Sequence, residues 1–223
     1  MVQTSRYIIQ VPRFTELLRQ MEFIAYRIET TITDPCHETL DVGFVIDASG
    51  SVGMDTFSRE KNFVKLVSRR FAATSPNTRL GLLVFSDTPK LFVDFADYES
   101  KTIEQFQANV AQATFQDGRS RIDLALRAVS QDFFTNRRSG VPRVLILVSD
   151  GRQSEDPGYY PLATAVKPLQ AQRVRIVGVG FGDSVDVENL KEITGSKDRI
   201  LLDQEINDID RLQMELVSKA CEI

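Results

Sequence analysis

The stretch "FVIDASGSVG" (Phe44–Gly53) decides the fold of this chain. An apolar run ends at Asp47, and hydroxyl side chains then follow at every second position, at Ser49 and Ser51. In an extended segment, alternate side chains point the same way, so these three side chains can converge on one point. Gly50 between them permits a tight backbone turn. The stretch therefore predicts a buried strand that ends in an oxygen-lined loop.

Several other short runs rich in Val, Ile, Leu and Phe also predict strands. Most of them do not alternate apolar and polar residues, which indicates strands that are covered on both faces. "KLFVDF" does alternate in part, and only residues 86–89 separate it from the run before it, which predicts a hairpin and an antiparallel edge strand. The predicted strands are "VGFVID" (42–47), "RLGLLVF" (79–85), "KLFVDF" (90–95), "RVLILVSD" (143–150), "VRIVGVGF" (174–181) and "RILLD" (199–203).

Segments of helical period lie between the predicted strands. Helices that alternate with buried strands predict an α/β fold. We expect a doubly wound, Rossmann-like and mainly parallel six-stranded sheet, with one antiparallel edge strand and helices on both faces, over residues 36–222. Shorter helices are predicted at 161–172 and 186–194. The longer apolar stripes are Phe57, Val64, Val67 and Phe71; Ile103, Phe106, Val110 and Ala113; Ile122, Ala125, Leu126, Val129 and Phe133; and Ile209, Leu212, Leu216, Val217 and Ala220.

Residues 1–35 form an N-terminal extension with an amphipathic stripe from Phe14 to Ile28, and Asp34-Pro35 ends it. We expect a helix that packs on the domain or belongs to a missing neighbour. A helix on a membrane surface is the alternative, but the polar face is not markedly basic.

The bulk composition excludes several classes of protein. The chain has 223 residues and a formal net charge of -4, which argues against a nucleic-acid partner. No apolar run approaches the roughly 18 residues that a membrane helix needs. The start has no secretory signal, so we expect either a cytosolic chain or a fragment or mature form of a secreted one. The two cysteines, Cys36 and Cys221, are either unrelated thiols or a disulfide that ties the ends together.

Oxygen-bearing residues follow three segments of the predicted fold. They are Asp47 to Ser51, Asp150-Gly151, and Ser120 at the start of a helix in "QDGRSRIDLAL". Ligands of open parallel sheets bind beyond the carboxyl ends of the strands, where we expect these loops to meet. Carboxylates and hydroxyls suit Mg²⁺ or Mn²⁺, and also Ca²⁺. The sequence therefore predicts a divalent-cation site.

These loops resemble the von Willebrand factor type A domain, also called the integrin I domain. "DASGS" is similar to its D-x-S-x-S signature, "GRSRIDLAL" to its second metal loop, and "VLILVSDG" to its third. The resemblance covers roughly residues 36–222 and is strongest to matrix-type domains, as in matrilins and collagen type VI. It implies a metal-ion-dependent adhesion site in which Ser49 and Ser51 coordinate the metal directly. Asp47 and Asp150 would act directly or through water.

The resemblance has further implications. Ser120 stands where the family usually has threonine, so it keeps the hydroxyl but lacks the methyl group that fixes the rotamer. Cys36 and Cys221 stand where extracellular members often carry a terminal disulfide. The implied location is extracellular, and the implied partner is a matrix protein such as a collagen, or a cell-surface receptor, that offers an acidic side chain to the metal. An intracellular type A domain that serves as a scaffold in a multi-subunit assembly is the alternative.

An enzyme is not expected. The single histidine, His37, precedes the first strand, and a site made largely of hydroxyls has no general base. Two other surfaces draw attention. Glu155, Asp156, Tyr159 and Tyr160 follow Asp150 and are candidates for ligand recognition. The basic segment "DFFTNRRSG" (132–140) suits a helix end, and a glycosaminoglycan site there is a minority interpretation.

Overall fold

The computed structural model describes residues 39–74, 77–98, 102–134, 138–204 and 208–222. These residues belong to the second of two compact units, Cys36–Ile223. The amphipathic helix predicted within residues 1–35 lies outside the described residues, as do Cys36 and His37. Among the helices that are described, none has the length and apolar content needed to cross a membrane.

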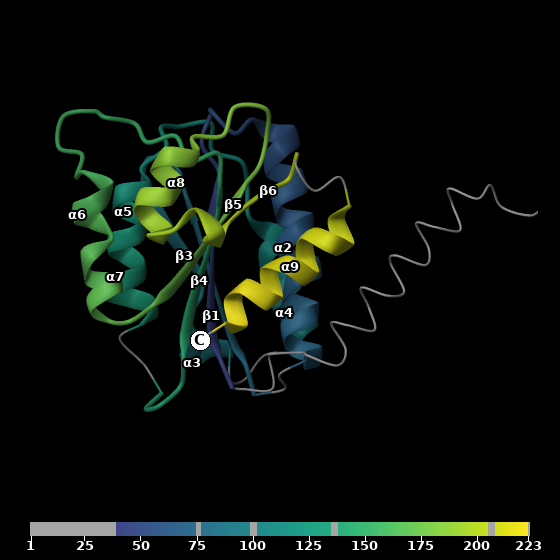
Figure 1. The fold of residues 1–223 in the computed structure, drawn as a ribbon. Coiled ribbons are helices and arrows are strands. Elements are labelled where there is room, and N and C mark those ends of the chain that lie inside the picture. The colour runs from purple at the N-terminus through teal and green to yellow at the C-terminus, as the bar shows by residue number, and fades with distance from the viewer. Residues whose placement is uncertain (1–38, 75–76, 99–101, 135–137, 205–207, 223) are drawn as a thin grey trace, which may run out of the picture. The chain divides into compact units, whose positions relative to one another are not determined.

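A sheet of six strands forms the centre of the described unit, in the order β3-β2-β1-β4-β5-β6 (Figure 1). Neighbouring strands run parallel except β2 and β3, which form an antiparallel pair with a bulge at Leu82/Leu83. The predicted doubly wound sheet with one antiparallel edge strand is confirmed. The strands are β1 (Asp41–Asp47), β2 (Arg79–Phe85), β3 (Pro89–Val93), β4 (Arg143–Ser149), β5 (Arg175–Gly180) and β6 (Ile200–Leu202).

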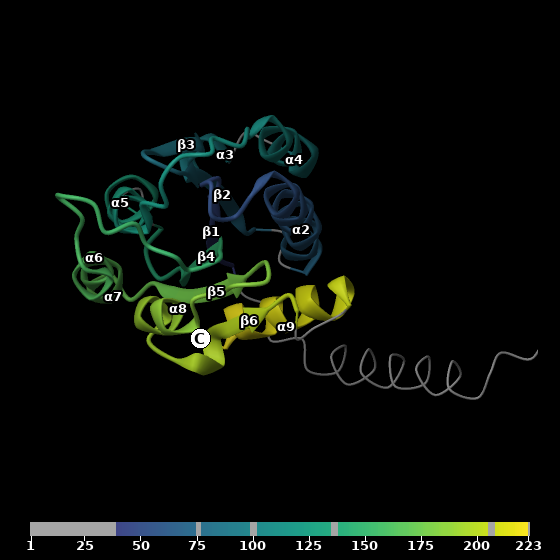
Figure 2. The same ribbon diagram turned by 90° about the horizontal axis from the view of Figure 1, so that it is seen from above.

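Helices cover both faces of this sheet, as the view from above shows (Figure 2). One layer contains α2 (Met54–Thr74), α4 (Ile103–Gln112) and α9 (Ile209–Cys221). The other contains α5 (Ile122–Ala128), α6 (Leu162–Ala165), α7 (Lys167–Ala171) and α8 (Val187–Thr194). A short helix, α3 (Phe95–Tyr98), follows β3, α5 continues into a π-helical turn (Val129–Phe133), and a 3₁₀ turn (Lys197–Arg199) precedes β6.

The sequence predicts one helix over 161–172, but the structure divides this segment into α6 and α7. Val166 ends the first helix and Pro168 lies at the start of the second. Proline has no backbone N–H and suits the first turn of a helix, not its interior. The prediction of a single helix is therefore wrong at this point.

Alternate residues of β1 enter two separate apolar cores. Val42, Phe44 and Ile46 pack in the core beneath α2, α4 and α9. Val45 lies in the core beneath α5 to α8. Because both faces are buried, the strand needs apolar side chains at nearly every position, which explains the unbroken apolar runs of the sequence. Because these strands are parallel, the carboxyl ends of β1, β4 and β5 lie at the same end of the sheet.

Candidate metal-binding site

Asp47, the last residue of β1, connects three segments of the chain at this end of the sheet. Its carboxylate is fully buried. Oδ1 accepts a hydrogen bond of 2.9 Å from the backbone N–H of Ser49. Oδ2 accepts one of 2.9 Å from the hydroxyl of Ser120 and one of 2.8 Å from the hydroxyl of Ser149. Asp47 therefore fixes the loop after β1, the start of α5 and the end of β4 relative to one another.

Ser49 and Ser51 project from the turn that follows β1. Their Oγ atoms lie 3.2 Å apart, and the Ser51 hydroxyl also contacts the carboxylate of Asp150. The backbone of the turn is held by a parallel bridge between Ser49 and Gly118, and the N–H of Gly50 donates 2.8 Å to the carbonyl of Gly118. The convergence of alternate side chains predicted from the sequence is therefore present.

Asp150 enters the site directly after β4. Its Oδ1 accepts a hydrogen bond of 2.9 Å from the backbone N–H of Arg152, and its carbonyl accepts one of 2.7 Å from Asp186. The next residue, Gly151, has a φ of 75°. A Cβ atom there would lie 2.6 Å from the carbonyl oxygen of Asp186 and 2.9 Å from Cγ of Leu190. Only glycine fits this turn, so the Asp-Gly pair fixes the direction of the carboxylate.

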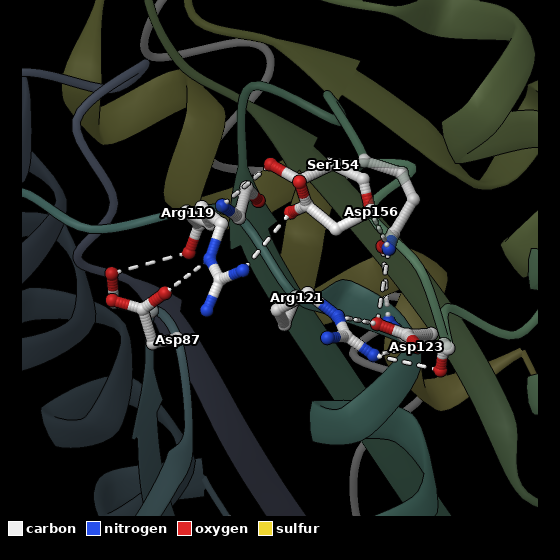
Figure 3. A network of polar contacts seen from close by, with 10 residues as sticks. Asp87, Arg119, Arg121, Asp123, Ser154 and Asp156 are labelled. Carbon is white, nitrogen blue, oxygen red and sulfur yellow. Dashed lines mark hydrogen bonds and ion pairs between the residues drawn. The ribbon is translucent and has the colours of Figure 1, made fainter.

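The loop that carries Ser120 is tied to the loop after β4 (Figure 3). The backbone N–H of Ser120 donates 3.1 Å to the hydroxyl of Ser154, and the N–H of Ser154 donates 2.8 Å to the carbonyl of Ser120. Beside this pair, the Arg119 guanidinium lies 2.5 Å from Asp87 and 3.5 Å from Asp156. The third candidate ligand is thus held from both sides.

A buried ion pair supports the same loop from below. Both oxygens of Asp123 accept from the Arg121 guanidinium, at 2.9 and 2.8 Å. The carboxylate also accepts from the side chain of Gln153 and from the backbone N–H of Tyr160, each at 3.0 Å. Burial alone would raise the pKa of Asp123, but these hydrogen bonds outweigh it and lower the pKa. The carboxylate is therefore ionised and fully bonded, and it organises the loop over 151–160.

The electrostatics of the site favour a cation. Burial raises the pKa of Asp47 to about 6, even though three hydrogen bonds to its carboxylate act in the opposite direction. Burial also raises the pKa of Asp150, while the bonds from Arg152 and Ser51 lower it. Two carboxylates that resist ionisation next to each other are stabilised in their charged form by a positive ion.

The donor set fits a hard divalent cation. Asp47, Ser49, Ser51, Ser120 and Asp150 contribute carboxylate and hydroxyl oxygens and no nitrogen or sulfur. The described residues contain no group of three or more His, Cys, Asp or Glu side chains that could hold a metal ion, so the site depends on its serines. A hollow of about 230 Å³ opens beside Ser51 and Asp150, bordered also by Thr56 and Phe181.

The four residues predicted for ligand recognition all lie in the loop after Asp150. Glu155 and Tyr160 are exposed, while Asp156 and Tyr159 are half-buried. The Arg127 guanidinium lies 4.1 Å from the centre of the Tyr160 ring, a cation–π contact that holds the ring on the surface.

Two residues next to the site were not predicted. Ser149 gives Asp47 its second hydroxyl partner, and its only signal is a polar residue at the end of an apolar run. Glu60 is fully buried in α2, near Asp47 and Asp150. Its signal is position: it follows Phe57 by three residues and precedes Val64 by four, so it lies on the buried face of the helix.

Comparison with known proteins gives matches over most of the described unit. The von Willebrand factor type A domain family matches residues 41–215. Cuticlin-6 of Caenorhabditis elegans is 25% identical over 78% of this chain and 29% of its own length. The collagen alpha-6(VI) chain of Mus musculus is 28% identical over 82% of this chain and 8% of its own length. The chain therefore spans less than a third of the length of these relatives.

The structural comparison agrees. Proximal thread matrix protein 1 from the mussel byssus matches with a TM-score of 0.72 and 25% identity, over 83% of this chain and 47% of that chain. A second structure of that mussel protein, which has 24% identity to this chain and a TM-score of 0.72, has a zinc-occupied MIDAS motif.

Proposed function

The chain belongs to the von Willebrand factor type A domain family, and from this premise we propose that it is a non-enzymatic adhesion module of the extracellular matrix. It binds a protein ligand through a divalent cation held by Asp47, Ser49, Ser51, Ser120 and Asp150. The observation that carries the proposal is the bonding of Asp47, whose carboxylate joins the Ser120 loop to the ends of β1 and β4. Residues far apart in the sequence thereby form one oxygen-lined cluster.

Each residue has a role in this proposal. Ser49, Ser51 and Ser120 offer hydroxyl oxygens to the cation, and Asp47 and Asp150 act directly or through water. When bound, the cation would supply positive charge, and a carboxylate of the partner would complete its set of oxygen ligands. Because the hollow beside Ser51 is open, the partner's side chain reaches the cation without any rearrangement of the buried Asp47.

Mg²⁺ or Mn²⁺ is the proposed cation, and Ca²⁺ also suits the donors. The zinc in the mussel protein's MIDAS motif supports a divalent ion at such a motif and leaves its identity to be measured. The described residues of the site include no histidine or cysteine, and the carboxylate of Asp47 is fully buried and bonded by three donors, which supports binding over catalysis.

The proposed partner is a matrix protein such as a collagen, or a cell-surface receptor. The relatives named cuticlin and collagen VI support an extracellular place for this chain. Exposed Glu155 and Tyr160, with Asp156 and Tyr159 beside them, form the proposed recognition loop. Aromatic side chains next to charges are common anchors at protein interfaces.

The disulfide between Cys36 and Cys221 stays a prediction, because Cys36 lies outside the described residues. It would support an oxidising, extracellular compartment. Labelling of the denatured protein with a thiol reagent, with and without reduction, tests it. Thiols that react without reduction would instead favour the intracellular scaffold.

Calorimetric titration of the metal-free protein with Mn²⁺ and Mg²⁺ tests the cation site. Ser51 is exposed, so Ser51→Ala removes a ligand with little effect on folding. Ser58→Ala is the matched control, because its hydroxyl is also exposed and, among the described residues, bonds to the carbonyl of Met54. We expect Ser51→Ala to weaken binding by about tenfold or more, as for other metal-site residues. Equal affinity of Ser51→Ala, Ser58→Ala and wild type would contradict the site.

The adhesion step is tested separately. Immobilised matrix proteins should bind the wild type in Mg²⁺ and release it in chelator, and Asp47→Ala should not bind under either condition. Binding that survives the chelator would show a partner surface independent of the cation.

A further inference from the structure

A second charged feature lies at the opposite end of the sheet, where β1, β4 and β5 begin. Here a hollow of about 630 Å³ is lined by Arg138, Arg143, Arg173, Arg175 and the segment 139–142. Its described lining contains four guanidinium groups and no carboxylate. In a chain whose formal net charge is -4, this is a local reversal of sign.

One side of the hollow is built on a buried carboxylate. The side chain of Asp41 is 1% exposed and lies 2.7 Å from the Arg79 guanidinium and 2.6 Å from that of Arg138. Arg138 also donates to the carbonyls of Leu40 and Asn77, each at 2.9 Å. Two guanidinium groups therefore share the carboxylate of Asp41. The position of Arg138 is fixed before any ligand arrives.

The other side of the hollow is held by the end of α9. Arg175 donates 2.6 Å to the carbonyl of Lys219, and its guanidinium lies 3.0 Å from the exposed carboxylate of Glu222. Burial, and then the positive charge of Arg199, lower the pKa of Arg175.

Arg173 is the exposed member of the set. It sits in the turn between α7 and β5 with a φ of 57°, an unusual conformation for a residue other than glycine. Its backbone N–H donates 2.9 Å to the carbonyl of Gln170. Across the hollow, Ser139 and Gly140 are exposed as well. The described lining of the hollow thus presents four arginine side chains.

We propose that this arginine hollow binds the sulfate groups of an extended polyanion, a sulfated glycosaminoglycan chain. Arginine pairs with tetrahedral oxyanions through two parallel hydrogen bonds. The guanidinium groups come from separate segments and face one open hollow, which suits several sulfates on one chain better than a single ion. The described lining of the hollow contains no aromatic side chain that could stack on the bases of a nucleic acid.

The test measures heparin binding to the full chain by calorimetry in the presence of chelator, which removes any contribution from the cation site. Arg173→Glu is the variant, because Arg173 is exposed and its side chain makes no described hydrogen bond or ion pair. Arg211→Glu is the matched control: Arg211 is exposed on the first turn of α9, and among the described residues its side chain pairs with Glu215. Thermal unfolding verifies that both variants are folded.

We expect Arg173→Glu to lose at least about tenfold in affinity and Arg211→Glu to bind like the wild type. A contact that neutralises about three charges should weaken roughly twentyfold between about 50 mM and 200 mM salt. Desulfated heparin should not bind, and inorganic sulfate should compete only at high concentration. Absence of heparin binding, or equal binding by the wild type and a folded Arg173→Glu, would overturn the proposal. So would selective binding of an acidic peptide or single-stranded nucleic acid with heparin inert.

Discussion

Replacement of Glu60 by methionine should stabilise this protein. Glu60 is fully buried in α2, and among the described residues neither of its carboxyl oxygens has a hydrogen-bond partner. Burial, followed by the negative charges of Asp47, Asp150 and Asp203, raises its pKa well above 4.5. The wild type therefore carries an unpaired acid inside an apolar core.

The size of the effect follows from these contacts. A buried polar group without a partner costs about 1–3 kcal/mol. Methionine has a similar length, no polar hydrogen-bonding requirement and a flexible side chain, so misfit should cost less than about 1.5 kcal/mol. We therefore expect Glu60→Met to raise the free energy of unfolding by about 1 kcal/mol, with an increase of about 2–4 °C in the melting temperature for a chain of this size.

Urea unfolding of the metal-free protein measures this change. Glu60→Gln is the matched control, since it keeps the shape and the polar atoms but cannot ionise. An acid with a raised pKa costs stability above its ordinary pKa, and this cost shrinks as the pH falls. The advantage of Glu60→Met should accordingly be smaller near pH 5 than near pH 7.

A loss of stability in Glu60→Met would refute the reasoning. It would mean that the carboxyl group makes a stabilising contact, such as a hydrogen bond through buried water, that offsets its burial. Equal stability of the wild type and Glu60→Gln at every pH would refute the role of ionisation alone.

Three further predictions concern the cation site. Gly151→Ala places a Cβ atom 2.6 Å from the Asp186 carbonyl at a φ of 75°, so it should lower the free energy of unfolding by about 2–4 kcal/mol; wild-type stability in urea would contradict this. The pKa of Asp47 rises from 3.8 to about 6 on folding. The metal-free protein should therefore become more stable, relative to Asp47→Asn, as the pH falls from about 6 to 4. Cation affinity should fall over the same range, and parallel pH profiles of the two proteins would refute the assignment. Ser120→Ala removes the 2.9 Å hydrogen bond to Asp47 and should lower the free energy of unfolding by about 1–2 kcal/mol. Ser120→Thr should keep both the stability and the cation binding of the wild type. A calorimetric titration in which Ser120→Ala binds the cation like Ser120→Thr would count against this.

The sheet and most of the candidate site could be predicted from short-range patterns. Unbroken apolar runs indicated strands covered on both faces, and the alternation of Asp47, Ser49 and Ser51 indicated a shared direction. Parallel strands then required that the loops after β1 and β4 meet. Each of these inferences depends only on residues within one strand or its loop, together with the direction of the strands.

The remainder depends on contacts that the sequence does not encode locally. The hydroxyl of Ser149 donates a hydrogen bond to Asp47 because β4 lies beside β1. Glu60 is buried because α2 packs that face on the sheet, although glutamate usually marks the solvent side of a helix. The arginine hollow shows the same limit. The basic segment over 132–140 contributes only one of its described arginines, and the others come from the starts of β4 and β5.

The two edges of the sheet bear on how this domain behaves at high concentration. An exposed strand edge is a template on which another chain can add a strand and start aggregation. At one edge β3 begins with Pro89, which has no N–H to donate, presents exposed Lys90, and pairs with β2 through a bulge. At the other edge β6 is only three residues long. Both edges therefore discourage strand exchange between molecules, so crowded copies should meet through side-chain surfaces and remain separately folded.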